Sequence, residues 1–323
     1  MVVALGGNAL LHRGERPDAA VQQANVDGVA TALAAPAHDH ELVITHGNGP
    51  QIGLLAGESA TDPALSAPYP LHLLGAQTQG MIGSLLARTL HDALPGHRIA
   101  ALVTHTLVHT LVHTLVHTLV RVDDPAFEHP TKFVGQASGE DDARALARHR
   151  DRDRDRDRPM ARDGKGRRRV VPSPVPERVV ETDTIHELLG AGVLVICAGG
   201  GGVPVTTDRD TGALTGVEAV VDKDLTAALL AEHLRADFLL ILTDVPCVYE
   251  GYGSPDQRPL LGTTPAQLRR GGFPDGSMRP KAEAAARFVE RTGGLAAIGA
   301  LDAAYEIVHG RSGTLVRPDL TVG

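Results

Sequence analysis

The segment VVALGGNAL (residues 2–10) joins an uninterrupted apolar run to a Gly-Gly-Asn turn. A short, continuous apolar run of this kind is typical of a strand that is covered on both faces of a parallel sheet. The same unit recurs as ELVITHGNGPQIG (41–53) and VLVICAGGGGVPV (193–205). The recurrence predicts parallel strands that each end in a glycine-rich turn.

Apolar runs alternate with helical patterns along the rest of the chain. The expected strands lie at 2–5, 41–45, 99–104, 193–198, 238–242 and 295–299, and the expected helices at roughly 18–35, 73–94, 181–190, 224–235 and 279–292. Such alternation indicates an α/β fold, in which a mainly parallel sheet lies between two layers of helices. Ligands bind at the carboxyl ends of the strands in open sheets of this type, which is where the glycine turns are expected.

The composition excludes several classes of protein. The net charge is −8, so neither nucleic acid nor an anionic membrane surface is an expected partner. No apolar run reaches the ~20 residues of a membrane helix, and the start of the chain has no signal-peptide pattern. Cys197 and Cys247 lie in apolar runs and are expected to be buried, reduced thiols. We therefore expect a cytoplasmic globular protein.

Two Gly-Asn turns carry a prediction of anion binding. Glycine lets the backbone approach a ligand closely, and the N–H groups of such turns and of helix starts bind phosphate or carboxylate. His46, beside the second turn, is a candidate for proton transfer or for a structural hydrogen bond, and we favour the structural role. The turn residues are Gly6, Gly7 and Asn8 after the first strand and Gly47, Asn48 and Gly49 after the second.

Two further strand ends are candidates for nucleotide contacts. The four glycines at 199–202 do not have the G-x-G-x-x-G spacing, and no Walker motif occurs, so a phosphate loop here would have another design. The segment LLILTDVPCVY (239–249) is a buried strand that opens into a polar loop. That loop either lines a pocket for a flat heterocycle or is a plain exit from the strand.

Lysine is scarce, because only four of the 31 Lys and Arg residues are lysines. A chain that otherwise uses arginine is expected to keep lysine where a compact ammonium group is required. Lys132, Lys223 and Lys281 each lie beside a turn element or at a helix start, whereas Lys165 lies in GKGRRR and is interpreted as a surface charge. Since lysine binds phosphate oxygens as a point charge, the first three are candidate phosphate ligands.

Taken together, these motifs resemble the carbamate kinases of the amino-acid-kinase family. The segments that carry the resemblance follow the family's order from residue 2 to about residue 318: VVALGGNAL, HGNGPQIG, HPTKFVG, RRVVPSP, GGGGVPV, GVEAVVDKD, LILTDV and GSMRPK. The resemblance implies a three-layer αβα sandwich with an open sheet of about eight strands and a protruding flap subdomain. It also implies a homodimer that transfers phosphate reversibly between ATP and carbamate, making ATP from ADP and carbamoyl phosphate in arginine fermentation.

The resemblance also assigns roles to residues. The turn at Gly6–Asn8 would contact the transferred phosphoryl group, and the turn at Gly47–Gly49 would hold the carbamate end. Lys132 would reach in from the flap, Lys223 would lie between the phosphates and Lys281 at the terminal phosphates of the nucleotide. Asp222 would orient Lys223 and Mg²⁺, which is expected to be bound mainly through the nucleotide phosphates and not by a cluster of side chains. The implied nucleotide-binding residues are Gly200, Gly201, Thr243, Asp244, Tyr249 and Met278.

The predicted organisation is one domain over residues 1–323. Residues 1–120 and 177–192 form the half that holds carbamate or carbamoyl phosphate, 121–176 form the protruding flap, and 193–323 form the nucleotide-binding half.

Two low-complexity segments depart from the family pattern. Residues 105–120 are four copies of HTLV where the family has about one, and 149–158 read HRDRDRDRDR, an expected solvated segment. Thr and Val favour β structure, so we favour an extended excursion for the repeats. The alternative is a helix, on which His105, His109, His113 and His117 would form a metal-binding stripe.

Two other functions remain open. One is a family member that phosphorylates another small carboxylate or phosphate. The segment HPTKFVG (129–135) argues against this alternative. The other is a nucleotide-binding homologue with impaired catalysis, because both repeats lie in or just before the flap that delivers Lys132.

Overall fold

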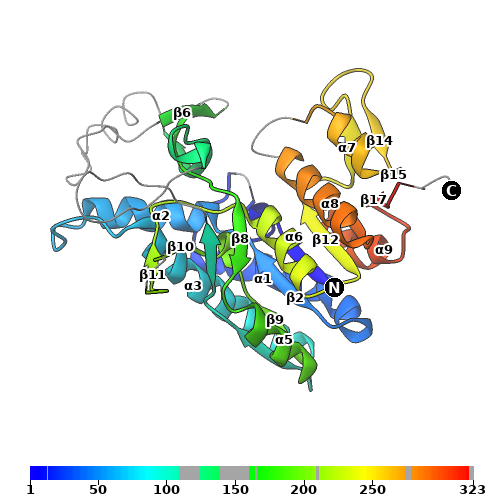
Figure 1. Ribbon diagram of the computed structural model, residues 1–323, viewed down its shortest axis with the longest axis horizontal. Coiled ribbons are helices and arrows are strands. Elements are labelled where there is room, and N and C mark those ends of the chain that lie inside the picture. The colour runs from blue at the N-terminus through cyan, green and yellow to red at the C-terminus, as the bar shows by residue number, and fades with distance from the viewer. Residues whose placement is uncertain are drawn as a thin grey trace.

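An eight-stranded sheet forms the centre of the molecule (Figure 1), with the strand order β15-β17-β16-β12-β1-β2-β9-β3. The computed structural model describes residues 1–12, 14–108, 124–138, 160–163, 166–208, 211–273 and 278–319. All neighbours in this sheet are parallel except β16 and β17. The strands are β1 (Val2–Leu5), β2 (Val43–His46), β3 (Arg98–Ala101), β9 (Val193–Ile196), β12 (Phe238–Thr243), β15 (Gly262–Thr263), β16 (Leu295–Ala300) and β17 (Thr314–Val316).

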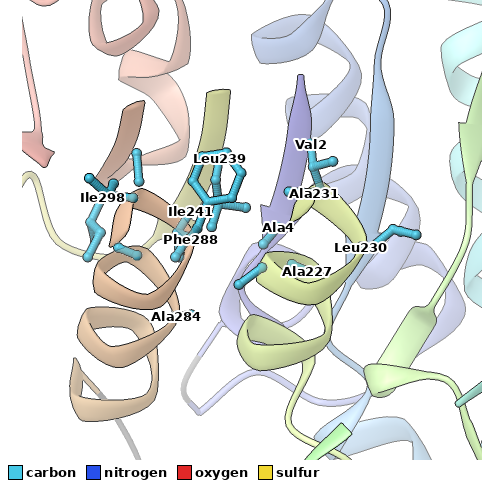
Figure 2. Packing of buried hydrophobic residues seen from close by; sticks show 14 of the residues in the cluster. Val2, Ala4, Ala227, Leu230, Ala231, Leu239, Ile241, Ala284, Phe288 and Ile298 are labelled. Atoms are coloured by element: carbon cyan, nitrogen blue, oxygen red, sulfur yellow. The ribbon is translucent and has the colours of Figure 1, made fainter. Parts of the chain in front are cut away.

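Helices cover both faces of this sheet. Successive residues of each strand point to opposite sides, so each apolar strand packs on both helix layers. Val2 and Ala4 of β1 belong to one buried cluster, with α5 (Thr182–Gly190), α6 (Lys223–His233) and α8 (Met278–Thr292). Figure 2 shows Phe288 of α8 and Ala227 of α6 packed on that face. Val3 and Leu5 face the second cluster, with α1 (Ala19–Asp39), α3 (Leu71–Ala93) and α9 (Ala304–Val308). The three-layer sandwich is thereby confirmed.

Besides a two-stranded hairpin, the described residues form two smaller sheets. The first has the order β11-β10-β4-β8, and the second, which belongs to the predicted flap, has the order β5-β7-β6. The flap packs through Val134 and Val171 on a cluster that includes Ile52 and Leu74. The bounds are β4 (His105–Val108), β8 (Pro176–Val179), β10 (Val203–Thr207) and β11 (Leu214–Gly216), then β5 (Lys132–Ser138), β6 (Met160–Asp163) and β7 (Gly166–Val171).

The remaining elements are short or connect the strands. Helix α2 (Gly49–Thr61) follows β2, as the expected helix start at the HGNG turn indicates, although its full length was not predicted. The others are α7 (Pro265–Arg270), the hairpin of β13 (Val248–Glu250) and β14 (Arg258–Leu260), and the 3-10 turns η1 (Gly7–Ala9), η2 (Pro125–Phe127), η3 (Gly199–Gly201) and η4 (Leu301–Ala303).

The expected strand at 99–104 is wrong in its extent. The chain leaves the large sheet after Ala101 and enters the smaller sheet at His105. Between them, the N–H of Thr104 donates to the side-chain oxygen of Gln79 (3.1 Å), so a side chain takes the place of a ladder partner.

The repeats are described only in part. The first HTLV copy forms β4, which pairs in parallel with β10 and antiparallel with β8, in agreement with the favoured β structure. The other three copies, the segment 149–158 and Lys165 lie outside the described residues. The helical metal stripe is wrong at His105, which lies in β4, and its other members, His109, His113 and His117, lie outside the described residues.

The sheet pairing bears on the predicted division of the chain. Strand β9 lies between β2 and β3, and β10 pairs with β4. Residues 193–207, which are predicted for the nucleotide-binding half, therefore hydrogen-bond to strands of the other half, while β10 also pairs with β11 of its own half. The division into halves stays a prediction. Cys197 and Cys247 are both free and buried, as expected. Among the residues that the structure describes, no helix is long and apolar enough to cross a membrane.

Candidate active site

The turns after β1 and β2 meet at the carboxyl edge of the sheet. The N–H of Gly47 donates to the carbonyl of Leu5 (3.0 Å), and the N–H of Gly6 donates to that of Leu242 (2.9 Å). A Cβ atom on Gly47 would lie 2.8 Å from the Cα of Gly7. The two backbones therefore touch at a distance that only glycine allows. Gly49 begins α2 directly after this contact.

The glycine loop after β9 inserts between two parts of the predicted site. Gly200 has φ +63°, and a Cβ there would lie 2.2 Å from the side chain of Asn48. A Cβ on Gly201 would lie 2.6 Å from the carbonyl of Val221. Gly200 and Gly201, which are predicted to bind nucleotide, thus pack against the turn at Gly47–Gly49 and the segment that leads to α6. This close packing accounts for glycine at both positions.

Three of the four lysines converge on two carboxylates at the start of α6. Lys223 of α6 and Lys281 of α8 both donate to Asp224, at 2.9 Å for Lys281. Lys132 of the flap strand β5 donates to Asp222. These five residues, from three separate elements, are called the lysine–aspartate cluster below.

Asp222 also fixes the start of the helix. Its Oδ1 accepts from the N–H of Asp224 (3.0 Å) and of Leu225 (3.4 Å), as an N-cap does. Its other oxygen accepts from Lys132. The predicted role of Asp222 was to orient Lys223, but Asp224 is the carboxylate that holds that ammonium group.

Burial and pairing determine the charges in the cluster. The exposed fractions of Lys223 and Asp224 are 8% and 4%. Burial lowers the pKa of Lys223 to about 8. Burial alone would raise the pKa of Asp224, but Lys223 and Lys281 hold it well below its usual range. Burial likewise opposes the charge on Lys281, whose pKa is nevertheless raised by Asp224. With all five residues ionised, the cluster has a net positive charge.

A further contact joins the first turn to the predicted nucleotide side. The amide of Asn8 donates to Asp244 (2.7 Å), which also accepts from the hydroxyl of Thr243 (3.1 Å).

Tyr249 lies in β13, with its ring 6.0 Å from that of Tyr252. Met278 begins α8, the helix that carries Lys281.

His46 has the surroundings of a structural residue. Its side chain is buried, and its Nδ1 lies 3.0 Å from the carbonyl of Gly47. Burial lowers its pKa to about 4, so the imidazole is neutral near pH 7. This placement agrees with the structural hydrogen bond that we favoured over proton transfer.

Sequence reasoning did not assign a role to Asp224. The sequence did contain a signal for Asp224, which directly follows Lys223 in a helix start rich in apolar residues. A carboxylate buried there requires a partner. No group of three His, Cys, Asp or Glu residues in the described part of the chain could hold a metal ion.

The chain is similar to known proteins over nearly its whole length. A family model described as "Amino acid kinase family" matches residues 1–298. The chain is 44% identical to a carbamate kinase of Rhizobium meliloti (strain 1021) over 98% of its own length and 92% of that protein. Two structures of carbamate kinase from Giardia lamblia are similar over 98% of both chains. The one bound to citric acid has a TM-score of 0.87 at 34% identity, and the one bound to AMP-PNP has a TM-score of 0.81 at 35% identity.

Proposed function

The chain belongs to the amino acid kinase family and is a carbamate kinase, and we propose that its lysine–aspartate cluster and glycine turns stabilise the phosphoryl group that passes between ATP and carbamate. The single observation that carries the proposal is the convergence of Lys132, Lys223 and Lys281 at the start of one helix. These are three of only four lysines in the chain.

The chemistry of the reaction calls for positive charge more than for a base. Carbamate is already an anion, so no proton has to be removed to create the nucleophile. The barrier lies in bringing two anions together and in the charge on the transferring group. Ammonium groups and backbone N–H groups that are already in place stabilise that charge without reorganisation.

The carboxylates hold the lysines ready for this task. Lys223 and Lys281 share Asp224, so their ammonium groups lie near one another although they repel. When phosphate oxygens arrive, each ammonium group gains a second acceptor while Asp224 keeps its position. The side chain of Lys132 is 33% exposed, compared with 9% for Lys223, which fits a lysine that a flap brings to the ligand.

The glycine turns supply the remaining contacts in this proposal. Gly6, Gly7 and Asn8 lie at the phosphoryl group, and Gly47, Asn48 and Gly49 at the carbamate end. Thr243, Asp244, Tyr249 and Met278 lie on the nucleotide side. The AMP-PNP complex of the Giardia lamblia protein supports a nucleotide site in a chain of this fold.

The residues present fit a Mg²⁺ ion that the nucleotide brings with it. The four carboxylate oxygens of Asp222 and Asp224 all accept hydrogen bonds, from lysine ammonium groups or from the start of α6. They are therefore engaged, and the phosphates remain as the principal ligands. When bound, the ion would neutralise charge on the phosphates.

We extend the proposal to the setting of the enzyme. The resemblance supports a homodimer that makes ATP from ADP and carbamoyl phosphate in arginine fermentation. Two free, buried thiols are consistent with a cytoplasmic location. Light scattering tests the dimer, for which the mass in solution should be twice the 33.9 kDa of the chain.

A coupled assay tests the function. Purified protein is given ADP, Mg²⁺ and carbamoyl phosphate, and ATP formation is followed. Acetyl phosphate replaces carbamoyl phosphate in one control, and glutamate with ATP is offered in another. We expect turnover with carbamoyl phosphate and at most a small fraction of it with the others.

The same experiment separates the alternatives. Preference for another phosphate donor would replace carbamate by a different substrate. Binding of AMP-PNP in calorimetry without any turnover would identify a nucleotide-binding homologue that has lost catalysis.

A further inference from the structure

We propose that Thr45, Gln79 and Thr104, three buried side chains behind the site, set the geometry of phosphoryl transfer by clamping the backbone at Ala198. None of them is expected to touch a substrate, so each is a positioning residue. The inference rests on the function proposed above. It concerns the distance between the carbamate turn and the lysine–aspartate cluster.

Ala198 has a conformation that a residue with a side chain rarely adopts. Its φ of 51° and ψ of 32° lie in the left-handed region, and it is fully buried. For a residue other than glycine this conformation costs roughly 1–2 kcal/mol. It persists only where surrounding contacts determine it.

Two threonine hydroxyls hold both ends of this residue. The N–H of Ala198 donates to the hydroxyl of Thr104 (2.9 Å), and its carbonyl accepts from the hydroxyl of Thr45 (2.8 Å). Both threonines are fully buried, and they come from different parts of the fold. The hydroxyl pair therefore determines the orientation of the peptide groups on either side of Ala198.

Gln79 of α3 determines how Thr104 acts. Its side-chain oxygen accepts from the N–H of Thr104 (3.1 Å) and lies 3.3 Å from its hydroxyl, while its side-chain nitrogen donates to the carbonyl of Thr104 (3.1 Å). The hydroxyl has only one hydrogen, and donation to Gln79 leaves a lone pair directed at Ala198. Gln79 thus fixes both the backbone and the hydroxyl of Thr104.

The clamp determines where the glycine loop runs. The loop at 199–202 follows Ala198 directly, and Gly200 lies against Asn48 while Gly201 lies against Val221. The carbonyl of Gly201 also accepts from Thr226 of α6 (3.2 Å). The loop therefore acts as a spacer between the turn that holds carbamate and the helix start that carries Lys223.

The spacing matters because reacting groups must be held within a narrow range. A misplacement of about 1 Å by a substitution far from the chemistry lowers a rate roughly 100-fold. Such a loss appears in kcat with little change in KM when the affected contacts are made in the transition state.

Thr104→Val tests the inference, because it keeps the shape of the side chain and removes the hydroxyl. We expect kcat for ATP formation to fall about 100-fold, with KM for ADP and for carbamoyl phosphate within about threefold of the wild type. Thr104→Ser restores the hydroxyl and should recover kcat to within about threefold. Thr45→Val, which leaves only a carbonyl without its hydroxyl donor, is the second variant should Thr104→Val fold poorly, and it should lower kcat in the same way.

Thr314→Val is the matched control for a general loss of stability. The hydroxyl of Thr314 also accepts from a backbone N–H, that of Val248 (2.8 Å), and donates to the carbonyl of Leu260, but in β17. Its thermal unfolding should shift as much as that of Thr104→Val, while kcat stays within about threefold of the wild type.

The results that overturn the inference are distinct from those that overturn the function. An unchanged kcat in Thr104→Val and Thr45→Val contradicts the clamp, and so does an equal loss of kcat in Thr314→Val. A wild-type enzyme without turnover of carbamoyl phosphate contradicts the proposed function instead.

Discussion

The two ends of helix α6 both carry basic side chains, yet their surroundings differ. At the N-terminal end Lys223 is buried and shares Asp224 with Lys281. At the C-terminal end His233 and Arg235 are exposed and line a cavity of about 310 Å³ together with residues at the start of α5. This cavity lies at the C-terminal end of the helix, whereas the paired, buried charges lie at its N-terminal end.

The helix dipole accounts for the different surroundings of the two ends. Cations at the C-terminal end of a helix stabilise it, so Arg235 needs no ligand to account for it. Cations at the N-terminal end are unfavourable, and burial adds to the cost. Lysines gathered there are accounted for by the carboxylates and, in the proposed function, by an anionic phosphate group. We therefore infer the site from buried charge placed against the dipole, and not from an open cavity.

The largest effect is expected from Asp224→Asn. The substitution leaves two buried ammonium groups without their carboxylate, and removing one member of such a group costs roughly 3–5 kcal/mol. The free energy of unfolding in urea should fall by that amount. His186→Ala, an exposed change beside the other end of α6, should alter it by less than about 0.5 kcal/mol. Equal losses in the two variants would remove the contrast between the ends.

Lys223→Ala comes next and concerns activity. The loss of one ammonium group that is already in place should lower kcat about 100- to 1,000-fold, or roughly 2.7–4 kcal/mol. Lys223→Arg should also be poor, because a planar guanidinium is wider than an ammonium group. His233→Ala at the other end should leave steady-state turnover unchanged. Near-normal turnover in both Lys223→Ala and Lys281→Ala would refute the assignment of the site.

The pH dependence of activity reports on the protonation of Lys223. Burial lowers the pKa of Lys223 to about 8 from 10.5, so above pH 8 this residue becomes neutral in the folded enzyme. The ratio kcat/KM, which reports on the free enzyme, should decline above about pH 8, by up to tenfold per pH unit.

Stability should show the opposite slope over the same range. Between pH 8 and 10.5 the unfolded state binds more protons at this residue than the folded state does, so its contribution to stability rises with pH. Below pH 8 both states are protonated and the contribution is constant. Urea unfolding of the wild type and of Lys223→Met measures this contribution as a difference, and a difference that falls with pH would contradict the assigned pKa.

The smallest effect is expected at the other end of the helix. Arg235 has φ 52°, a left-handed conformation that glycine adopts without a steric penalty. Arg235→Gly should therefore stabilise the protein by up to about 1 kcal/mol, after the greater entropy of glycine in the unfolded chain is subtracted. Thermal unfolding measures the change, and kcat should be unaffected. A loss of stability or of kcat in this variant would mean that Arg235 has a role that its exposed position does not indicate.

The sequence predicted the main sheet well because its signal is local. Apolar runs such as 2–5 and 238–242 need only their own residues to be recognised as buried strands. The run at 99–104 was predicted as one strand because it is continuously apolar. That continuity does not reveal that the chain changes sheet between Ala101 and His105. That change depends on Gln79, which lies far away in the sequence, and no local pattern contains it.

The HTLV repeats show a second limit of local sequence patterns. All four HTLV copies offer the same side chains to a strand, so the sequence does not tell which copy forms β4. The structure shows the first copy in place, with His105 bound to Glu181 (2.7 Å). Only this copy is preceded by a threonine, Thr104, whereas valine precedes each later copy. A later copy in this position would place valine where the hydroxyl meets Ala198.

The residues of the candidate site could be predicted from the sequence, but their pairing could not. The scarcity of lysine, together with positions beside turns or at helix starts, singled out Lys132, Lys223 and Lys281 as candidate phosphate ligands. Their partner Asp224 was not assigned, because its contacts with Lys223 and Lys281 join α6 to α8 and depend on the tertiary fold.

The most direct test is a crystal structure of the enzyme with AMP-PNP and Mg²⁺. We predict that the ammonium nitrogens of Lys223 and Lys281 lie about 3 Å from oxygens of the terminal phosphates. Lys132 should reach the same group from the flap. Phosphates that bind out of reach of Lys223, or beside His233 and Arg235 at the far end of α6, would contradict the convergence of these lysines on the transferred group.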